Sequence, residues 1–181
     1  MKIVIATPLY PPDIDETALY VKELAKRLGG EHEVNIVTYG KIPEKVEGVN
    51  IVSVRKKHPL PIRLLLYTFA LWKVARRTEI IYAQNGPSVE LPAGVISLIT
   101  KKPFIMHMID KNSHERASKN WIFRKIENFV FKRAKKIVSD TPLPRPEILP
   151  FQAMSEEEIL KYEESWIKHI NELNEIFKNE K

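Results

Sequence analysis

Short apolar runs alternate with longer amphipathic runs over residues 1–140, and this alternation constrains the fold more than any other feature of the sequence. An unbroken short apolar run is typical of a buried strand, whereas apolar residues three or four positions apart are typical of a helix. Strands that alternate with helices predict βαβ units, and therefore an α/β domain with three α/β/α layers and a mostly parallel sheet of about six strands. The expected strands are residues 2–7, 34–39, 49–54, 79–83, 103–109 and 136–139, and the expected helices are residues 17–28, 62–77, 88–100 and 118–134.

The alternation stops at a proline-rich segment. Residues 141–150 contain four prolines, which favour an extended linker over residues 141–154. Ser155 and Glu158 then form a capping-box pattern that opens a long helix at residues 155–179. We expect the apolar face of this helix to pack back on the 1–140 domain. That face consists of Ile159, Tyr162, Trp166, Ile170, Leu173 and Phe177.

The composition limits the location and the partners. The 181 residues include no cysteine, so disulfides and thiolate metal sites are excluded and the cytoplasm is the expected location. The longest apolar stretch, residues 64–72, is too short to span a membrane, so any membrane contact would be peripheral. A net charge of +6 favours anionic partners, although a mildly basic enzyme surface explains the charge equally well.

Polar side chains follow several of the expected strands. The carboxyl ends of parallel strands meet at one edge of the sheet, and ligands of open α/β sheets bind beyond that edge. We therefore expect a small-molecule ligand at the stretches 8–17, 39–40, 84–88 and 107–114. The residues expected to bind it are Tyr10, Gln84, Asn85, Gly86, His114 and Glu115.

The loop after the first strand, at residues 8–17, is rich in acids. Loops at this place usually bind phosphates through glycines and free N–H groups, and acids would repel a phosphate. Asp13, Asp15 and Glu16 are well suited to the start of a helix, with Asp or Thr17 as the cap. Alternatively, one of the carboxylates orients a histidine or binds a cation. No metal-binding spacing occurs in the sequence, so we expect neither a metal nor a cofactor.

The segment Gly86-Pro87-Ser88 opens the helix expected at residues 88–100. In one interpretation Ser88 caps this helix, because serine is a preferred N-cap residue. In the other, the free N–H groups and the helix dipole form an anion or oxyanion site.

The stretch "HMIDKNSHERAS" carries two histidines and an aspartate after the fifth strand. A histidine at a strand end is more often structural than catalytic, but this group also permits a small hydrolase or esterase site. In that hypothesis Ser88 is the nucleophile, His107 is the base, and a carboxylate orients the base. The candidate carboxylates are Asp15, Glu16 and Asp110. No GxSxG motif accompanies them.

Residues 55–77 form a basic amphipathic segment. It is expected to cover the sheet with a solvated basic face, or to dock on anionic lipid head groups with help from a second basic cluster. No nucleic-acid-binding pattern is visible, so no nucleic acid is expected as a partner. The second basic cluster consists of Lys132, Arg133, Lys135 and Lys136.

Three stretches carry a resemblance to a known family: "MKIVIATPLYPPDI…ALYVKELAKRLGGEHEVNIVTYG", "IIYAQNGPSVELPAGVISLITKKPFIM" and "ERA…KRAKKIVSD". Over about residues 1–140 the chain resembles the N-terminal domain of family 4 glycosyltransferases of the GT-B fold. That resemblance implies a Rossmann-like domain that mainly holds the acceptor, while a C-terminal domain binds most of the nucleotide-sugar. The last helix is similar to the family's terminal helix, which crosses back onto the N-terminal domain.

The chain also departs from the family pattern. Asp15-Glu16-Thr17 stands where the family usually has Gly-Gly-Pro or similar, and Glu90 stands where a glycine is common. Residues 109–115 replace the family's Gly-Asp-Tyr/Trp-x-Trp-Glu, and no donor-binding domain is present. The resemblance thus implies a lobe that transfers no sugar alone and pairs with a separate donor-binding chain. An engineered scaffold with a rewritten site, the hydrolase, and a membrane-surface or partner-binding module stay open, as does whether the chain is an enzyme.

Overall fold

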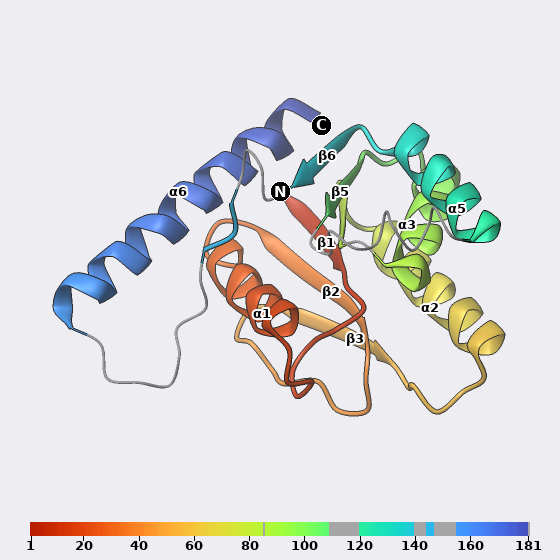
Figure 1. Cartoon of the computed structure of the whole chain (residues 1–181), viewed down its shortest axis with the longest axis horizontal. Coiled ribbons are helices and arrows are strands. Elements are labelled where there is room, and N and C mark those ends of the chain that lie inside the picture. Colours follow the sequence, from red (N-terminus) through yellow and green to blue (C-terminus); the bar gives the residue numbers. More distant parts are fainter. Residues whose placement is uncertain (85, 109–119, 140–143, 147–154, 181) are drawn as a thin grey trace.

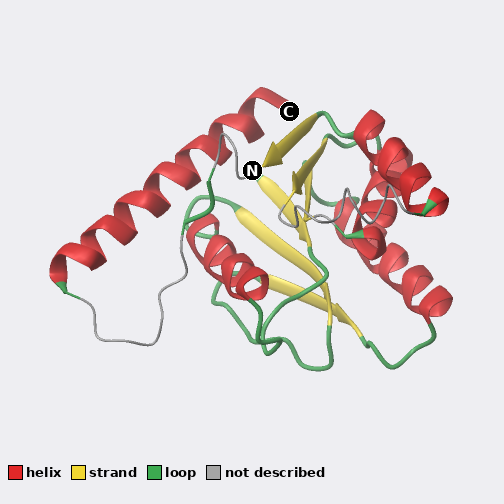
Figure 2. Ribbon diagram, in the orientation of Figure 1, coloured by secondary structure: helices red, strands yellow, loops and turns green. Residues whose placement is uncertain are grey.

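The chain folds around one six-stranded sheet in which all strands are parallel. The computed structural model describes residues 1–84, 86–108, 120–139, 144–146 and 155–180. Helices cover both faces of the sheet, as expected from the alternation in the sequence (Figures 1 and 2). The strands are β1 (Lys2–Ala6), β2 (Glu33–Tyr39), β3 (Asn50–Val54), β4 (Ile80–Gln84), β5 (Phe104–Met108) and β6 (Lys136–Ser139), and the helices are α1 (Glu16–Leu28), α2 (Leu60–Ala75), α3 (Pro87–Thr100), α5 (Trp121–Arg133) and α6 (Glu156–Glu180).

The strand order is β3-β2-β1-β4-β5-β6. From β1, strands β2 and β3 follow on one side, and β4, β5 and β6 follow on the other. The order therefore reverses between β1 and β4, which is the place where open α/β sheets bind their ligands beyond the carboxyl edge. At this point Thr7, just after β1, donates a hydrogen bond from Oγ1 to Gln84 Oε1 at 2.6 Å.

Successive residues of the strands enter two separate cores. Ile3 and Ile5 of β1 lie in a core with α1 and α6, while Val4 and Ala6 lie in a core with α2, α3 and α5. The side chains alternate in this way because successive Cβ atoms of a strand point to opposite faces. Helices α1 and α6 thus lie on one side of the sheet, and α2, α3 and α5 lie on the other (Figure 1).

The last helix, α6, packs on the domain as the sequence predicted. Trp166, Leu173 and Phe177 are fully buried in the same core as α1. The Tyr20 and Trp166 rings stack with their centroids 5.6 Å apart, and the edge of Phe177 meets Tyr82 of β4 at 5.7 Å. α6 therefore contacts both α1 and the sheet.

The first turns of α6 behave differently. Residues 155–161 are exposed, and this end of the helix extends beyond α1 (Figure 1). The prediction that Ile159 packs on the domain was therefore wrong, because nothing described lies beneath the overhanging turns and 46% of Ile159 is exposed. The capping box is confirmed, since Ser155 N and Oγ both donate to Glu158 Oε2. Most of the expected linker, residues 141–143 and 147–154, lies outside the described residues.

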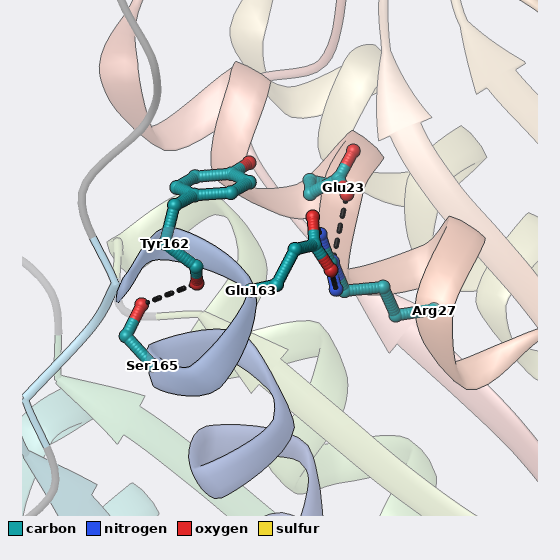
Figure 3. A network of polar contacts seen from close by, with 5 residues as sticks. All are labelled: Glu23, Arg27, Tyr162, Glu163 and Ser165. Atoms are coloured by element: carbon teal, nitrogen blue, oxygen red, sulfur yellow. Dashed lines mark hydrogen bonds and ion pairs between the residues drawn. The ribbon is translucent and has the colours of Figure 1, made fainter. Parts of the chain in front are cut away.

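One arginine fastens α6 to α1 where the overhang ends. The Arg27 guanidinium donates from Nη1 and Nη2 to the two carboxylate oxygens of Glu163, at 2.8 and 2.7 Å. Its Nε donates to Glu23 at 2.7 Å, so one arginine joins two acids (Figure 3). The same guanidinium lies 5.1 Å from the centre of the Trp166 ring. Such a bidentate pair fixes the orientation as well as the contact of the two helices.

Candidate functional site

A cavity of about 730 Å³ opens at the carboxyl ends of β1, β2 and β3. Three loops form it: the loop after β1, the loop after β2 and the start of the connection between β3 and α2. This is the edge at which parallel α/β sheets hold ligands. The lining residues are Tyr10, Pro11, Pro12, Asp13, Tyr39, Gly40, Lys41, Ile42, Pro43, Arg55, Lys56 and Lys57.

Two tyrosines give the cavity a rigid wall. Tyr39 stacks on Tyr67 with ring centroids 4.4 Å apart, and its hydroxyl donates to the Ser88 carbonyl oxygen at 2.9 Å. Tyr10 is buried, and its hydroxyl has no hydrogen-bond partner among the described residues. Burial is the main cause that raises the pKa of each of Tyr10 and Tyr39 to about 12, so both stay protonated at neutral pH.

The cavity is strongly cationic. Lys41, Arg55 and Lys57 are exposed, and within the described parts of the chain none of the three forms an ion pair. The fourth cation, Lys56, donates to Asp13 Oδ2 at 2.6 Å, so the one carboxylate of the lining is already paired. The cavity therefore combines apolar and aromatic walls with three available positive charges.

The acidic start of α1 serves the helix. Asp15 has an extended backbone, with φ at −151°, and its Oδ1 accepts a hydrogen bond from Thr17 N at 2.8 Å. This is N-cap geometry, which confirms the helix-start interpretation for Asp15. Glu16 occupies the first turn, where a negative charge favours the helix dipole. Both acids are exposed, and Asp13 forms the ion pair with Lys56.

The start of α3 differs from the prediction. The N-cap is Gly86, with φ at +145°, and Pro87 is the first helical residue, so the prediction that Ser88 caps the helix was wrong. A glycine is needed there because other residues rarely adopt that φ. Glu90 takes over part of the capping: its Oε1 accepts a hydrogen bond from Gly86 N at 2.6 Å. Burial raises the pKa of the Glu90 carboxyl.

His107 lies at the end of β5 and is completely buried. Its Nδ1 is 2.5 Å from the Tyr82 hydroxyl, and its ring meets Tyr20 edge-on at 5.7 Å. Burial, and then the nearby His169 and Arg145, lower the pKa of His107 to about 3. The imidazole is therefore neutral at physiological pH and belongs to the core under α1 and α6.

The structure does not bring the proposed hydrolase residues together. His107 packs against Tyr20 on the α1 side of the sheet, whereas Ser88 lies on α3, which covers the opposite face. Asp15 and Glu16 are exposed at the start of α1, away from a buried base. Asp110 lies outside the described residues, so its part in that hypothesis stays a prediction.

The expected ligand-binding residues have mixed positions. Tyr10 lines the cavity, whereas Gln84 is buried and joins β4 to the loop after β1 through Thr7. Gly86 serves as the cap of α3. The other three, Asn85, His114 and Glu115, lie outside the described residues.

The sequence analysis missed the cations of the cavity. Lys41 and Arg55 directly follow the predicted strands 34–39 and 49–54, with only Gly40 between the first strand and Lys41. The rule that strand ends form the site, applied to the second and third strands as to the others, would have found them. Instead, the sequence analysis groups Arg55 and Lys57 with the helix expected at residues 62–77, in one basic amphipathic segment over residues 55–77. In the structure α2 begins at Leu60, so the first basic residues of that segment belong to the cavity.

No group of three or more His, Cys, Asp or Glu side chains among the described residues is placed to hold a metal ion. Within the same residues, no helix has both the length and the apolar character required to cross a membrane.

The fold and its edge cavity define a Rossmann-like α/β/α lobe, and solved structures share this fold over part of their length. The chain is similar to Anabaena Alr3699/HepE solved in complex with UDP, with 19% identity and a TM-score of 0.53, over 76% of this chain and 37% of that one. It is also similar to a putative UDP-N-acetylglucosamine 2-epimerase from Listeria monocytogenes, with 12% identity and a TM-score of 0.53, over 76% and 38%. The chain thus spans well under half the length of these structures.

At such identities the likeness concerns the fold alone. No protein-family model matches the sequence, and no curated protein matches it either. The comparisons therefore show a shared Rossmann-like fold, and any activity must be argued from this chain's own residues.

Proposed function

We propose that this chain is the acceptor-holding lobe of a GT-B-type glycosyltransferase. The observation that carries the proposal is the 730 Å³ cavity at the carboxyl ends of β1, β2 and β3. It lies beside the point where the strand order reverses, on a lobe with the fold of sugar-nucleotide enzymes. Its accessible apolar side chains, Pro12, Ile42 and Pro43, suit the apolar face of a sugar ring, and the cations around them can donate hydrogen bonds to its hydroxyls.

The donor would be held elsewhere. The two helix starts that face the point of strand-order reversal carry carboxylates: Asp15 and Glu16 begin α1, and Glu90 occupies the start of α3. Carboxylates at helix starts compete with phosphate for the same N–H groups. A second, donor-binding lobe on a separate chain would complete the site. By itself the lobe would bind nucleotide-sugars no better than millimolar.

Calorimetry tests this division of labour. The isolated chain, titrated with UDP-glucose and GDP-mannose, is expected to give no measurable heat of binding at micromolar concentrations. A saccharide panel followed by saturation-transfer NMR is expected to give signals that the variant Gly40→Phe abolishes. Gly40 lines the cavity, its φ is not positive, and a Cβ added there meets no atom within 4 Å, so the variant blocks the cavity without straining the fold. Micromolar binding of either nucleotide-sugar by the isolated chain would refute the proposal.

A second candidate function is association with an anionic membrane surface. It is favoured by exposed apolar side chains on the first turns of α2 and α5, which lie in the same layer of the domain. Cationic side chains accompany them: Lys73 lies 4.7 Å from the centre of the Phe69 ring, and Lys125 lies 4.7 Å from that of Trp121. Apolar groups ringed by cations are typical of interfacial helices. The exposed apolar residues are Leu60, Ile62, Leu65, Leu66, Phe69, Trp121, Ile122 and Phe123.

In this proposal the second basic cluster contributes less to membrane binding than the sequence analysis expected. Arg133 donates to the Ser97 carbonyl oxygen, and Lys135 donates to the Glu180 carbonyl oxygen. Both side chains are therefore engaged within the lobe, and the membrane surface in this proposal is α2 with the start of α5.

Vesicle co-sedimentation tests the membrane proposal. The chain is expected to sediment with vesicles that contain phosphatidylserine and not with pure phosphatidylcholine vesicles. The double variant Leu65→Ser, Phe69→Ser is expected to lose at least about tenfold in binding. Its matched control is Ile167→Ser, which removes an equally exposed apolar side chain from α6. Equal, negligible binding to both kinds of vesicle would refute this function.

A further inference from the structure

The cavity at the ends of β1, β2 and β3 holds more positive charge than a neutral ligand requires. Lys41 comes from the loop after β2, and Arg55 and Lys57 come from the segment after β3, so the cations converge from two separate loops. The sole acid of the lining, Asp13, is engaged with Lys56. A sugar hydroxyl needs a hydrogen-bond donor or acceptor, but it does not need three ammonium or guanidinium groups.

We propose that the cavity binds a ligand that bears a phosphate group, which makes the acceptor of the proposed transferase a phosphorylated molecule. This inference rests on the proposed function only where it calls the ligand the acceptor; the binding of a phosphate group is argued independently. Phosphate carries up to two negative charges and three strong acceptor oxygens, and a guanidinium binds such a group through two parallel hydrogen bonds. A carboxylate would satisfy one or two of the three cations and leave the rest uncompensated.

The remaining walls indicate what the phosphate is attached to. Tyr10, Tyr39 and Ile42, together with three prolines, form the apolar part of the lining. A bare phosphate would fill a small part of the 730 Å³ and would contact none of this apolar surface. The ligand is therefore a phosphate ester whose organic part, a sugar or an isoprenoid chain, packs against the accessible apolar side chains Pro12, Ile42 and Pro43.

Calorimetry with paired probes tests whether the phosphate group contributes to binding, and it distinguishes a sugar phosphate from a lipid phosphate as the ligand. Glucose 6-phosphate is titrated against glucose, and geranyl phosphate against geraniol. In at least one pair the phosphorylated member is expected to bind at least about tenfold more tightly than its neutral counterpart. The pair that shows the larger difference identifies the sugar or the lipid as the source. Raising the salt concentration is expected to weaken this binding, because the cations are exposed.

Variants place the binding in the cavity. Arg55→Gln and Lys57→Gln are each expected to lower the affinity for the phosphorylated probe about tenfold or more. The weak affinity for the neutral probe is expected to stay unchanged. Lys178→Gln is the matched control, because it removes an exposed cation from the last turns of α6, away from the cavity (Figure 1). Gly40→Phe is expected to abolish binding of both members. Thermal melts of every variant establish that the fold is intact.

The outcomes separate this inference from the proposed function. If phosphorylated and neutral probes bind equally, or if none binds, the phosphate inference is overturned while the acceptor role is judged by the saccharide panel. If phosphate-dependent binding survives both Arg55→Gln and Gly40→Phe, the phosphate binds elsewhere and the inference is also overturned. If the isolated chain binds nucleotide-sugars at micromolar concentrations, the division into lobes fails, whereas the preference for phosphate esters stands or falls by the paired probes.

Discussion

The two halves of the sheet's carboxyl edge differ in what their polar groups do. Among the described residues beyond β4 and β5, Gln84 accepts from Thr7, Glu90 accepts from Gly86 N, and His107 bonds to Tyr82, so each of these three side chains has a partner within the lobe. Beyond β2 and β3, cations stand exposed around a cavity. A group already satisfied by the protein holds the structure together, and a charge left open is available to a ligand. The half of the edge beyond β2 and β3, the open half, is therefore the candidate site. The half beyond β4 and β5, the closed half, has the residues that look catalytic.

The largest expected effect comes from removing the aromatic that covers the closed half. Trp166 is fully buried and stacks on Tyr20, which in turn meets His107. Trp166→Ala leaves a cavity and is expected to lower the free energy of unfolding by roughly 3–5 kcal/mol. Urea denaturation measures it, with the exposed neighbour Ile167→Ala as control, expected within about 0.5 kcal/mol of wild type. A loss below 1 kcal/mol for Trp166→Ala would show that α6 is an appendage and not part of the closed half.

Acidification is expected to destabilise the closed half next. The unfolded chain binds a proton at His107 as the pH falls through its ordinary pKa of 6.5, while the folded pKa is about 3. Stability contributed by the neutral imidazole is therefore complete above pH 6.5 and is lost progressively down to about pH 3. Between pH 7 and pH 5 the loss is about 2 kcal/mol.

Urea midpoints at pH 7 and pH 5 measure this loss. His107→Gln lowers stability by itself, so the quantity compared is the pH-dependent difference within each protein. That difference is expected to be about 2 kcal/mol smaller in His107→Gln than in wild type. Identical differences in the two proteins would place His107 in water, contrary to a closed half.

The next prediction concerns the carboxylate that occupies the start of α3. Glu90→Ala removes the acceptor of the partly buried Gly86 N–H and is expected to cost about 1–2 kcal/mol. Glu90→Gln keeps an acceptor oxygen and is expected to cost less than half of that, because it also removes a buried carboxyl whose pKa is raised. Thermal denaturation at neutral pH compares the two variants. Equal losses would indicate that the carboxylate charge, and not the hydrogen bond, matters at this helix start.

The smallest expected effect is at the start of α1. Asp15→Ala removes the N-cap bond to Thr17 N and is expected to cost about 1 kcal/mol, without any change in binding of the phosphorylated probe. The matched variant Glu16→Ala, which removes a neighbouring exposed acid, is expected to cost at most about 0.5 kcal/mol. If instead Asp15→Ala altered ligand binding more than stability, the acid would belong to the site and the boundary of the open half would need to be moved.

The fold was predictable because the signals that specify it are local. The apolar runs and the 3.6-residue spacing predicted all six strands and the helices between them, with boundaries shifted by a few residues. Caps were harder: at α1 the sequence left the choice between an aspartate and Thr17 open, and Asp15 is the cap; at α3 the conformation of Gly86 and the bond from Gly86 N to Glu90 determine the start. These depend on the exact course of the chain around two residues.

The site was less predictable, because it depends on which helix covers which face. His107 lies at the end of one strand and Ser88 follows another at the same edge, so the sequence permitted them to meet. Whether they do depends on the reversal of strand order at β1, which puts α1 and α3 on opposite faces. No local pattern in the sequence records that reversal.

The bidentate ion pair between Arg27 and Glu163 joins residues 136 positions apart in the sequence, and this separation affects how the chain folds during synthesis. The sheet is complete at Ser139, but the face that α6 covers stays open until Trp166 and Phe177 have left the ribosome. A contact between residues so far apart in sequence costs loop entropy before its interactions form. We therefore expect α6 to dock late. For that interval Tyr20 and Tyr82 stay exposed, and the nascent lobe presents an apolar groove to which a chaperone can bind.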